Sequence, residues 1–225
     1  FLHAVLGLFR SPFRFRELVK QTCFIGASSF TVIFFTALSV GMVLGLQGYY
    51  SLNKFGAEGM LGSAVSLSLV MELGPVLTAL MVAGRAGSAM CAEIGIMRIS
   101  EQIDALECKF LATLISVPLL TGLFNVVGIA GGYLAGVKLM GVNGGAFIAG
   151  MQQSVTNHDL RMGVIKSIVF ALLVVWICTG RGYFVQKIRG AGFGAESVSK
   201  VTTQAVVLSS IAVLVFDYLL TAVLL

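Results

Sequence analysis

The sequence predicts an all-α membrane protein, with five transmembrane helices, an N-terminal interfacial amphipathic helix and one cytoplasmic amphipathic helix. The first observation is composition: 57% of the residues are apolar, 11% are charged and the mean hydropathy is +0.97. Soluble domains carry about 25% charged residues. The second observation is that the apolar residues form five runs, each near the roughly 20 residues that a helix needs to cross a bilayer. These runs are 24–46, 59–84, 110–137, 163–180 and 205–225.

The segments outside these runs are more polar and define the expected organisation. Residues 1–22 mix Phe and Leu with arginines, which is typical of a helix lying in the membrane interface. Residues 23–225 then form a single five-span domain. Its second span leads through a Gly/Ala-rich bend into a long polar connection, 85–109, and its third span leads into a glycine-rich loop, 138–162.

The distribution of basic residues predicts the orientation. With a cytoplasmic N-terminus, most of the 15 Lys and Arg residues lie on the cytoplasmic side, as the positive-inside rule requires. The cytoplasmic set is Arg10, Arg14, Arg16, Lys20, Arg85, Arg98, Lys109, Arg181, Lys187, Arg189 and Lys200. The C-terminus is then on the far side. Because the net charge of +5 comes from residues that flank the spans, nucleic acid is not an expected partner.

No pattern for catalysis or metal binding is visible. The chain has two histidines, which lie far apart, and four cysteines without a metal-ligand spacing. It lacks the G-x-x-x-x-G-K-[ST] loop that binds nucleotide phosphates. We therefore expect no catalytic residues, no metal and no cofactor in this chain, and any energy from ATP must come from another subunit.

Three charged residues lie within predicted spans: Glu72 in the second, Lys166 near the outer end of the fourth and Asp217 in the fifth. A charge at the bilayer centre costs about 2.5–3.5 kcal/mol, so such residues face a bundle interior or a wet cavity. The three could lock helices together, line a substrate cavity or relay protons. Lys166 alone could instead snorkel to the outer headgroups.

Small residues recur along the first span, where Gly41, Gly45 and Gly48 follow one another at roughly helical spacing. Small residues let helix backbones approach closely in lipid. The pattern fits either packing within one subunit or the seam of a dimer.

Residues 92–107 show an amphipathic pattern, with Ile96, Ile99, Ile103 and Leu106 on one stripe of a helix. The other faces carry Glu93, Arg98, Glu101, Gln102, Asp104 and Glu107. Helices that rest on anionic lipid favour Lys and Arg, whereas this segment is acidic. The pattern therefore favours a protein partner that receives the helix in a groove.

The stretch ELGPVLTALMVAGRAGSAMCAEIG, which begins at Glu72, is followed by MRISEQIDALE. Together with GMVLGLQGY in the first span and VTTQAVV…FDYLLTA near the end, it resembles the MlaE-type permease family of ABC transporters, also called the YrbE/TGD family. The resemblance covers nearly the whole chain, and its central motif is long and specific.

The resemblance implies a non-catalytic permease of the bacterial inner membrane. Such a permease moves phospholipid between that membrane and a periplasmic MCE-domain carrier, and so maintains the lipid asymmetry of the outer membrane. It also implies a homodimer, a periplasmic MCE-domain ring, and cytoplasmic ATP-binding cassette subunits that hold ATP and Mg.

The resemblance also implies site residues. The ATPase-coupling set is Glu93, Ile96, Met97, Arg98, Ile99, Glu101 and Gln102. Leu44, Leu52, Phe55 and Leu73 are expected to hold acyl chains, with Glu72 and Lys166 at the headgroup. Some relatives carry a basic residue where this chain has Met71, so Lys166 is expected to supply the cation.

Two other functions remain open from the residues alone. One is a proton- or ion-coupled secondary carrier that uses Glu72, Lys166 and Asp217. The other is a passive scaffold that anchors a periplasmic ring. The acidic cytoplasmic segment, the missing nucleotide loop and the family resemblance together favour the ABC permease.

Overall fold

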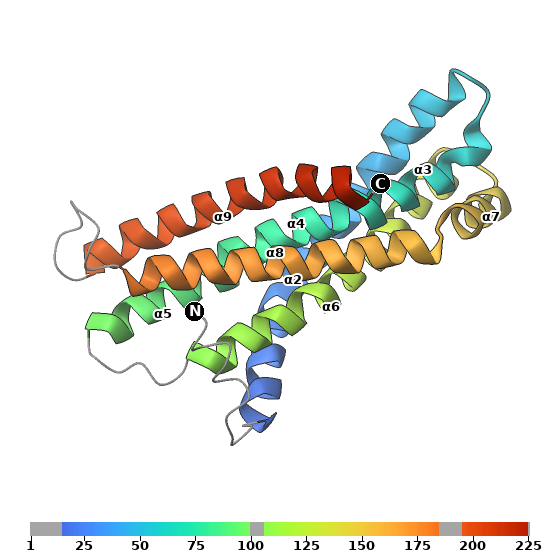
Figure 1. The fold of residues 1–225 in the computed structure, drawn as a ribbon. Coiled ribbons are helices and arrows are strands. Elements are labelled where there is room, and N and C mark those ends of the chain that lie inside the picture. The colour runs from blue at the N-terminus through green and yellow to red at the C-terminus, as the bar shows by residue number, and fades with distance from the viewer. Residues whose placement is uncertain (1–14, 100–105, 185–194, 225) are drawn as a thin grey trace. The chain divides into compact units, whose positions relative to one another are not determined.

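The computed structural model describes residues 15–99, 106–184 and 195–224, and within these ranges it contains helices joined by short turns and no β-strand (Figure 1). The helices are α2 (Phe15–Asn53), α3 (Leu61–Ser68), α4 (Gly74–Val82), α5 (Ser88–Ile99), α6 (Leu106–Tyr133), α7 (Gly144–Ser154), α8 (Asn157–Tyr183) and α9 (Ala195–Leu224). Short segments of other helical form are the 3-10 turn η1 (Glu58–Met60) and the π-helical turns η2 (Leu69–Leu73), η3 (Ala83–Gly87) and η4 (Leu134–Leu139).

Five stretches of the described chain are long and apolar enough to cross a membrane. They are Ser29–Asn53, Glu58–Met97, Leu111–Leu139, Asn157–Tyr183 and Ser197–Leu224. Each overlaps one predicted span, so the prediction of an all-α membrane protein with five transmembrane helices is confirmed.

The predicted bend after the second span is wrong. Helical structure continues from α4 through η3 into α5, and the backbone N–H of Ser88 donates to the carbonyl of Ala83 across the wide π turn. Glycine and alanine keep their N–H groups, unlike proline, so a Gly/Ala-rich stretch widens the helix here without ending it.

The predicted glycine-rich loop at 138–162 is also wrong, because α7 and the first turns of α8 lie within it. The side chain of Asn143 caps α7 by accepting a hydrogen bond from Gly145 N at 2.9 Å. Before α8, Thr156 N and Thr156 Oγ1 each donate to Asp159 Oδ2 at 2.8 Å. These are the side-chain caps that begin helices in polar sequence.

The predicted N-terminal interfacial helix, 1–22, is only partly described. Residues 1–14 lie outside the described residues, and from Phe15 the chain belongs to α2. This helix runs through the predicted boundary between residues 22 and 23 without a break.

The chain forms two compact units. Unit 1 comprises Phe1–Ser29, Ala79–Val117 and Ile168–Phe216, and unit 2 comprises Phe30–Thr78, Pro118–Ser167 and Asp217–Leu225. The core of unit 1 includes Met90, Ile94 and Val175, together with the buried free thiols Cys91 and Cys178.

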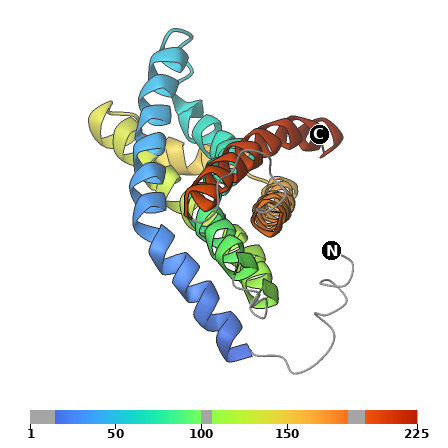
Figure 2. The ribbon, with the colours of Figure 1, turned by 90° about the vertical axis from the view of Figure 1, so that its left-hand side faces the viewer.

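Close helix packing within unit 2 explains the glycines of the first span. A Cβ atom at Gly41 would overlap the carbonyl of Gly128, and one at Gly45 would lie 2.8 Å from the carbonyl oxygen of Gly132. The second half of α2 therefore lies directly on α6 (Figure 2). Of the two interpretations of these glycines, packing within one subunit is the one that the contacts support.

This packing predicts that Gly41→Ala destabilises the protein. The added methyl group forces two backbones apart, and overpacking of this kind costs about 1–3 kcal/mol. The matched control is Gly26→Ala, also in α2, where a Cβ atom has no neighbour within 4 Å. Thermal unfolding in detergent micelles should show a lower midpoint for Gly41→Ala alone; equal midpoints for the two variants would contradict this packing.

Candidate functional site

The candidate site lies in unit 2, where the second span departs from α-helical geometry. The π turn η2 ends with the N–H of Gly74 donating to the carbonyl of Leu69, five residues earlier. Pro75 follows, and proline has no N–H to donate. The carbonyls of Val70 and Met71, five and four residues before it, therefore receive no backbone hydrogen bond from position 75.

Helix α8 lies against these two carbonyls. A Cβ atom at Gly163 would stand 2.6 Å from Val70 O, so only glycine permits this approach. Three residues later, and hence on the same side of α8, Lys166 Nζ donates to Met71 O at 3.0 Å. Gly163 and Lys166 thus place α8 against the Val70 and Met71 carbonyls, to which Pro75 cannot donate a hydrogen bond.

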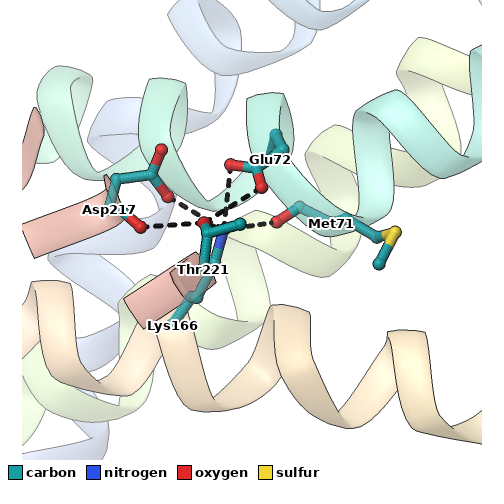
Figure 3. A network of polar contacts seen from close by, with 5 residues as sticks. All are labelled: Met71, Glu72, Lys166, Asp217 and Thr221. Carbon is teal, nitrogen blue, oxygen red and sulfur yellow. Dashed lines mark hydrogen bonds and ion pairs between the residues drawn. The ribbon is translucent and has the colours of Figure 1, made fainter. Parts of the chain in front are cut away.

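The Lys166 ammonium also meets three side-chain oxygens (Figure 3). It lies 2.9 Å from Glu72 Oε2, 2.9 Å from Asp217 Oδ1 and 2.7 Å from Thr221 Oγ1. Thr221 Oγ1 in turn lies 3.1 Å from Glu72 Oε1 and 2.8 Å from the Asp217 carbonyl. One cation therefore joins residues from the second, fourth and fifth spans; we call these four side chains and the Met71 carbonyl the charged cluster.

The cluster holds two carboxyl groups, of Glu72 and Asp217, and one amino group, of Lys166. If both carboxyl groups are ionised, they contribute two negative charges against the single positive charge of Lys166. An ammonium has three N–H donors, and four oxygens surround this one. Lys166 is therefore fully engaged within the protein.

Exposure differs sharply among the three charged residues. The Lys166 side chain is 0% exposed, that of Asp217 is 20% exposed and that of Glu72 is 40% exposed. Glu72 is consequently the group through which the cluster meets its surroundings. Because lipid tails cannot solvate a carboxylate, this side of unit 2 requires water, a polar ligand or protein beside it.

These contacts correct the snorkelling interpretation of Lys166. The sequence predicted a fourth span beginning at residue 163, which placed Lys166 in its first turn; α8 begins at Asn157, so Lys166 lies in its third turn. Its ammonium points into the protein. The related expectation that Lys166 supplies a cation to a lipid phosphate stays a prediction, and the burial of the side chain and its bonds to oxygens of this chain favour a role within the protein instead.

The remaining interpretations of the three charges fit different members of the cluster. Lys166 and Asp217 connect helices, as expected for a structural ion pair. Glu72 takes part in that pair and is also partly exposed, as expected for the lining of a cavity.

The residues expected to hold acyl chains all belong to unit 2. Leu44 in α2, Leu52 near its end and Leu73 beside Glu72 are half-buried, and Phe55, in the turn after α2, is 84% exposed. No contact within the chain assigns them a role, and their part in lipid binding stays a prediction.

The residues expected to couple to an ATPase belong to unit 1. Ile96 is 58% exposed on α5, while Glu93 and Met97 are half-buried. Arg98 and Ile99 are in α5, but their side chains are not described, and Glu101 and Gln102 lie outside the described residues. Of the predicted apolar stripe, Ile103 is also outside this range and Leu106 begins α6.

Sequence reasoning missed three contributors to the cluster. Thr221 stands four residues after Asp217 in α9, a spacing that places both on one helix face. Pro75 stands four residues after Met71, which signals a free carbonyl. Gly163 stands three residues before Lys166. The residue spacings were visible in the sequence, but the meeting of the three spans was not.

The comparisons with known proteins identify the family of the chain. Residues 18–223 match the family described as Permease MlaE. The chain belongs to the MlaE permease family. A Haemophilus influenzae protein named intermembrane phospholipid transport system permease protein MlaE is 43% identical, over 98% of this chain and 87% of its own length.

Less similar proteins also align along nearly the whole chain. A Rickettsia bellii protein named probable ABC transporter permease protein is 38% identical, over 98% of this chain and 87% of its own length. The chloroplast protein TRIGALACTOSYLDIACYLGLYCEROL 1 of Arabidopsis thaliana is 28% identical, over 97% of this chain and 64% of its own length. The match therefore covers both units and the whole charged cluster.

Proposed function

We propose that this chain is the membrane subunit of an ABC transporter that moves phospholipid between the bacterial inner membrane and a periplasmic MCE-domain carrier. In this way it maintains the lipid asymmetry of the outer membrane. The proposal is supported by membership of the MlaE permease family and by the name of the Haemophilus influenzae relative.

The observation that carries the proposal is the partly exposed Glu72 carboxylate within a helical stretch that is apolar enough to cross a membrane. A carboxylate within a membrane span needs a polar neighbour. In the proposed transporter, two copies of the chain enclose a wet cavity, and the phospholipid headgroup lies beside Glu72. Leu44, Leu52, Phe55 and Leu73 contact the acyl chains.

Glu72 meets the headgroup as a hydrogen-bond acceptor. Its carboxylate complements the N–H and O–H donors of ethanolamine and glycerol headgroups. Lys166 does not contact the phosphate, because its three donors are used within the charged cluster. Its role is to hold Glu72 and Asp217 in place and to offset part of their charge.

ATP is bound and hydrolysed by separate cytoplasmic subunits. The predicted orientation places the N-terminus and α5 on their side of the membrane, since most basic residues flank the spans there. Ile96 and its acidic neighbours enter a groove on the ATPase. Closure of the ATPase pair on ATP pushes on α5 and narrows the lipid cavity.

Reconstitution tests the proposal directly. Proteoliposomes containing the permease and its ATPase subunits should transfer labelled phospholipid to an MCE-domain acceptor only when ATP and Mg are present. Collapse of the proton gradient should leave the rate unchanged. Transfer that follows a pH gradient without nucleotide would instead identify a secondary carrier based on Glu72, Lys166 and Asp217.

A further inference from the structure

We infer that Pro75 is a positioning residue of the transport site: it reserves the carbonyl of Met71 as a fixed acceptor for Lys166. In a regular helix that carbonyl accepts the N–H of residue 75. Proline cannot supply it, and Lys166 Nζ occupies the carbonyl at 3.0 Å.

A main-chain carbonyl gives the ammonium an acceptor at a fixed position, which a side chain does not. Glu72, Asp217 and Thr221 can each change rotamer, whereas the Met71 carbonyl is fixed by the backbone of the second span. The hydrogen bond to it anchors Lys166 within 2.9 Å of both carboxylates. Pro75 thus acts on Glu72 through Lys166, without a polar atom of its own in the charged cluster.

The close approach of α8 supports the same assignment. Val70 O, the other carbonyl to which position 75 cannot donate, would be 2.6 Å from a Cβ atom at Gly163. The glycine lets the α8 backbone come near enough for Lys166, one turn further along, to reach Met71 O. Val70 O and Met71 O therefore both lie against the same side of α8.

The Met71 carbonyl can be observed alone. Met71–Glu72 is the single Met–Glu pair in the sequence, so protein labelled with carbonyl-¹³C methionine and ¹⁵N glutamate gives one selected resonance in solid-state NMR. We expect Lys166→Met to move this resonance upfield, because a charge-assisted hydrogen bond is lost. In the Pro75→Ala background, the shift that Lys166→Met causes in this resonance should be less than half as large. The reason is that the new N–H of residue 75 also donates to the Met71 carbonyl.

Stability provides the second readout. Lys166→Met leaves the Met71 carbonyl unbonded, and Pro75→Ala supplies a backbone donor for it. Pro75→Ala should therefore raise the unfolding midpoint more in the Lys166→Met protein than in the original chain. The matched control is Pro118→Ala within α6, whose effect should be the same in both backgrounds.

This inference rests on the proposed function only for its transport consequence. Pro75→Ala should lower phospholipid transfer several-fold in the original chain and have no further effect in the Lys166→Met protein. If Lys166→Met transfers lipid normally, the proposed function of the cluster fails, while the NMR and stability cycles still decide the role of Pro75. Equal NMR shifts in both backgrounds, or equal stability effects of Pro75→Ala, would overturn the inference.

Discussion

Replacement of Lys166 by methionine is expected to stop phospholipid transfer and to destabilise the fold. The variant keeps the length of the side chain but leaves Glu72 and Asp217 as neighbouring carboxylates without a cation. Removal of one partner from a buried ion pair costs about 3–5 kcal/mol. We expect the lower part of this range, because Glu72 is 40% exposed and solvent screens its charge. Thermal unfolding in micelles and transfer in proteoliposomes measure the two effects.

A charge-neutral variant separates the structural role of the cluster from its role in transport. Combining Lys166→Met with Glu72→Gln and Asp217→Asn removes the unpaired charges, and exchange of a whole buried ion pair for neutral groups is often harmless to stability. We expect the triple variant to regain most of the lost stability while transfer remains absent. Full transfer by the triple variant would mean that the cluster stabilises the fold but has no role in transport.

Ile96→Glu is expected to uncouple the permease from its ATPase. Ile96 is 58% exposed on α5, and it lies next to the acidic residues that the proposed groove receives. A central apolar contact is typically worth at least about 2 kcal/mol of binding free energy, or roughly 30-fold in affinity. Pull-down of the ATPase subunit from solubilised membranes should fail for this variant.

The control for this experiment is Ile96→Leu, which keeps an apolar side chain of similar volume at the same position. It should bind the ATPase and support transfer. Normal ATPase binding by Ile96→Glu would contradict the assignment of α5 as the coupling segment. It would mean that the exposed side of α5 at Ile96 does not contribute to binding of the ATPase subunit.

The sequence was sufficient to predict the elements that depend on long apolar runs. All five spans follow from the hydrophobic length that a bilayer requires, and the family follows from the motif around Glu72. The helix at 144–154 was missed because its glycines look like a loop. Its cap at Asn143, and its packing through Phe147 against Gly62, outweigh the low helix propensity of glycine.

The charged cluster shows what sequence alone could not predict. Glu72, Lys166 and Asp217 were each identified as costly charges in a membrane, yet their meeting depends on the rotation of three helices about their axes. The predicted start of the fourth span was six residues too late, and this error left open the interpretation that Lys166 reaches the membrane surface. The acceptor at Met71 is a backbone carbonyl, and although its spacing from Pro75 is visible in the sequence, its contact with Lys166 is not.

The central claim is that a phospholipid in transit lies beside Glu72, and photocrosslinking tests it most directly. A photoreactive amino acid in place of Leu73 should capture phospholipid in the assembled transporter, and the yield should change when ATP is added. The same amino acid in place of Val126, which is 69% exposed on α6, should capture bulk lipid whether or not ATP is present. Equal, ATP-independent capture at both positions would contradict the account.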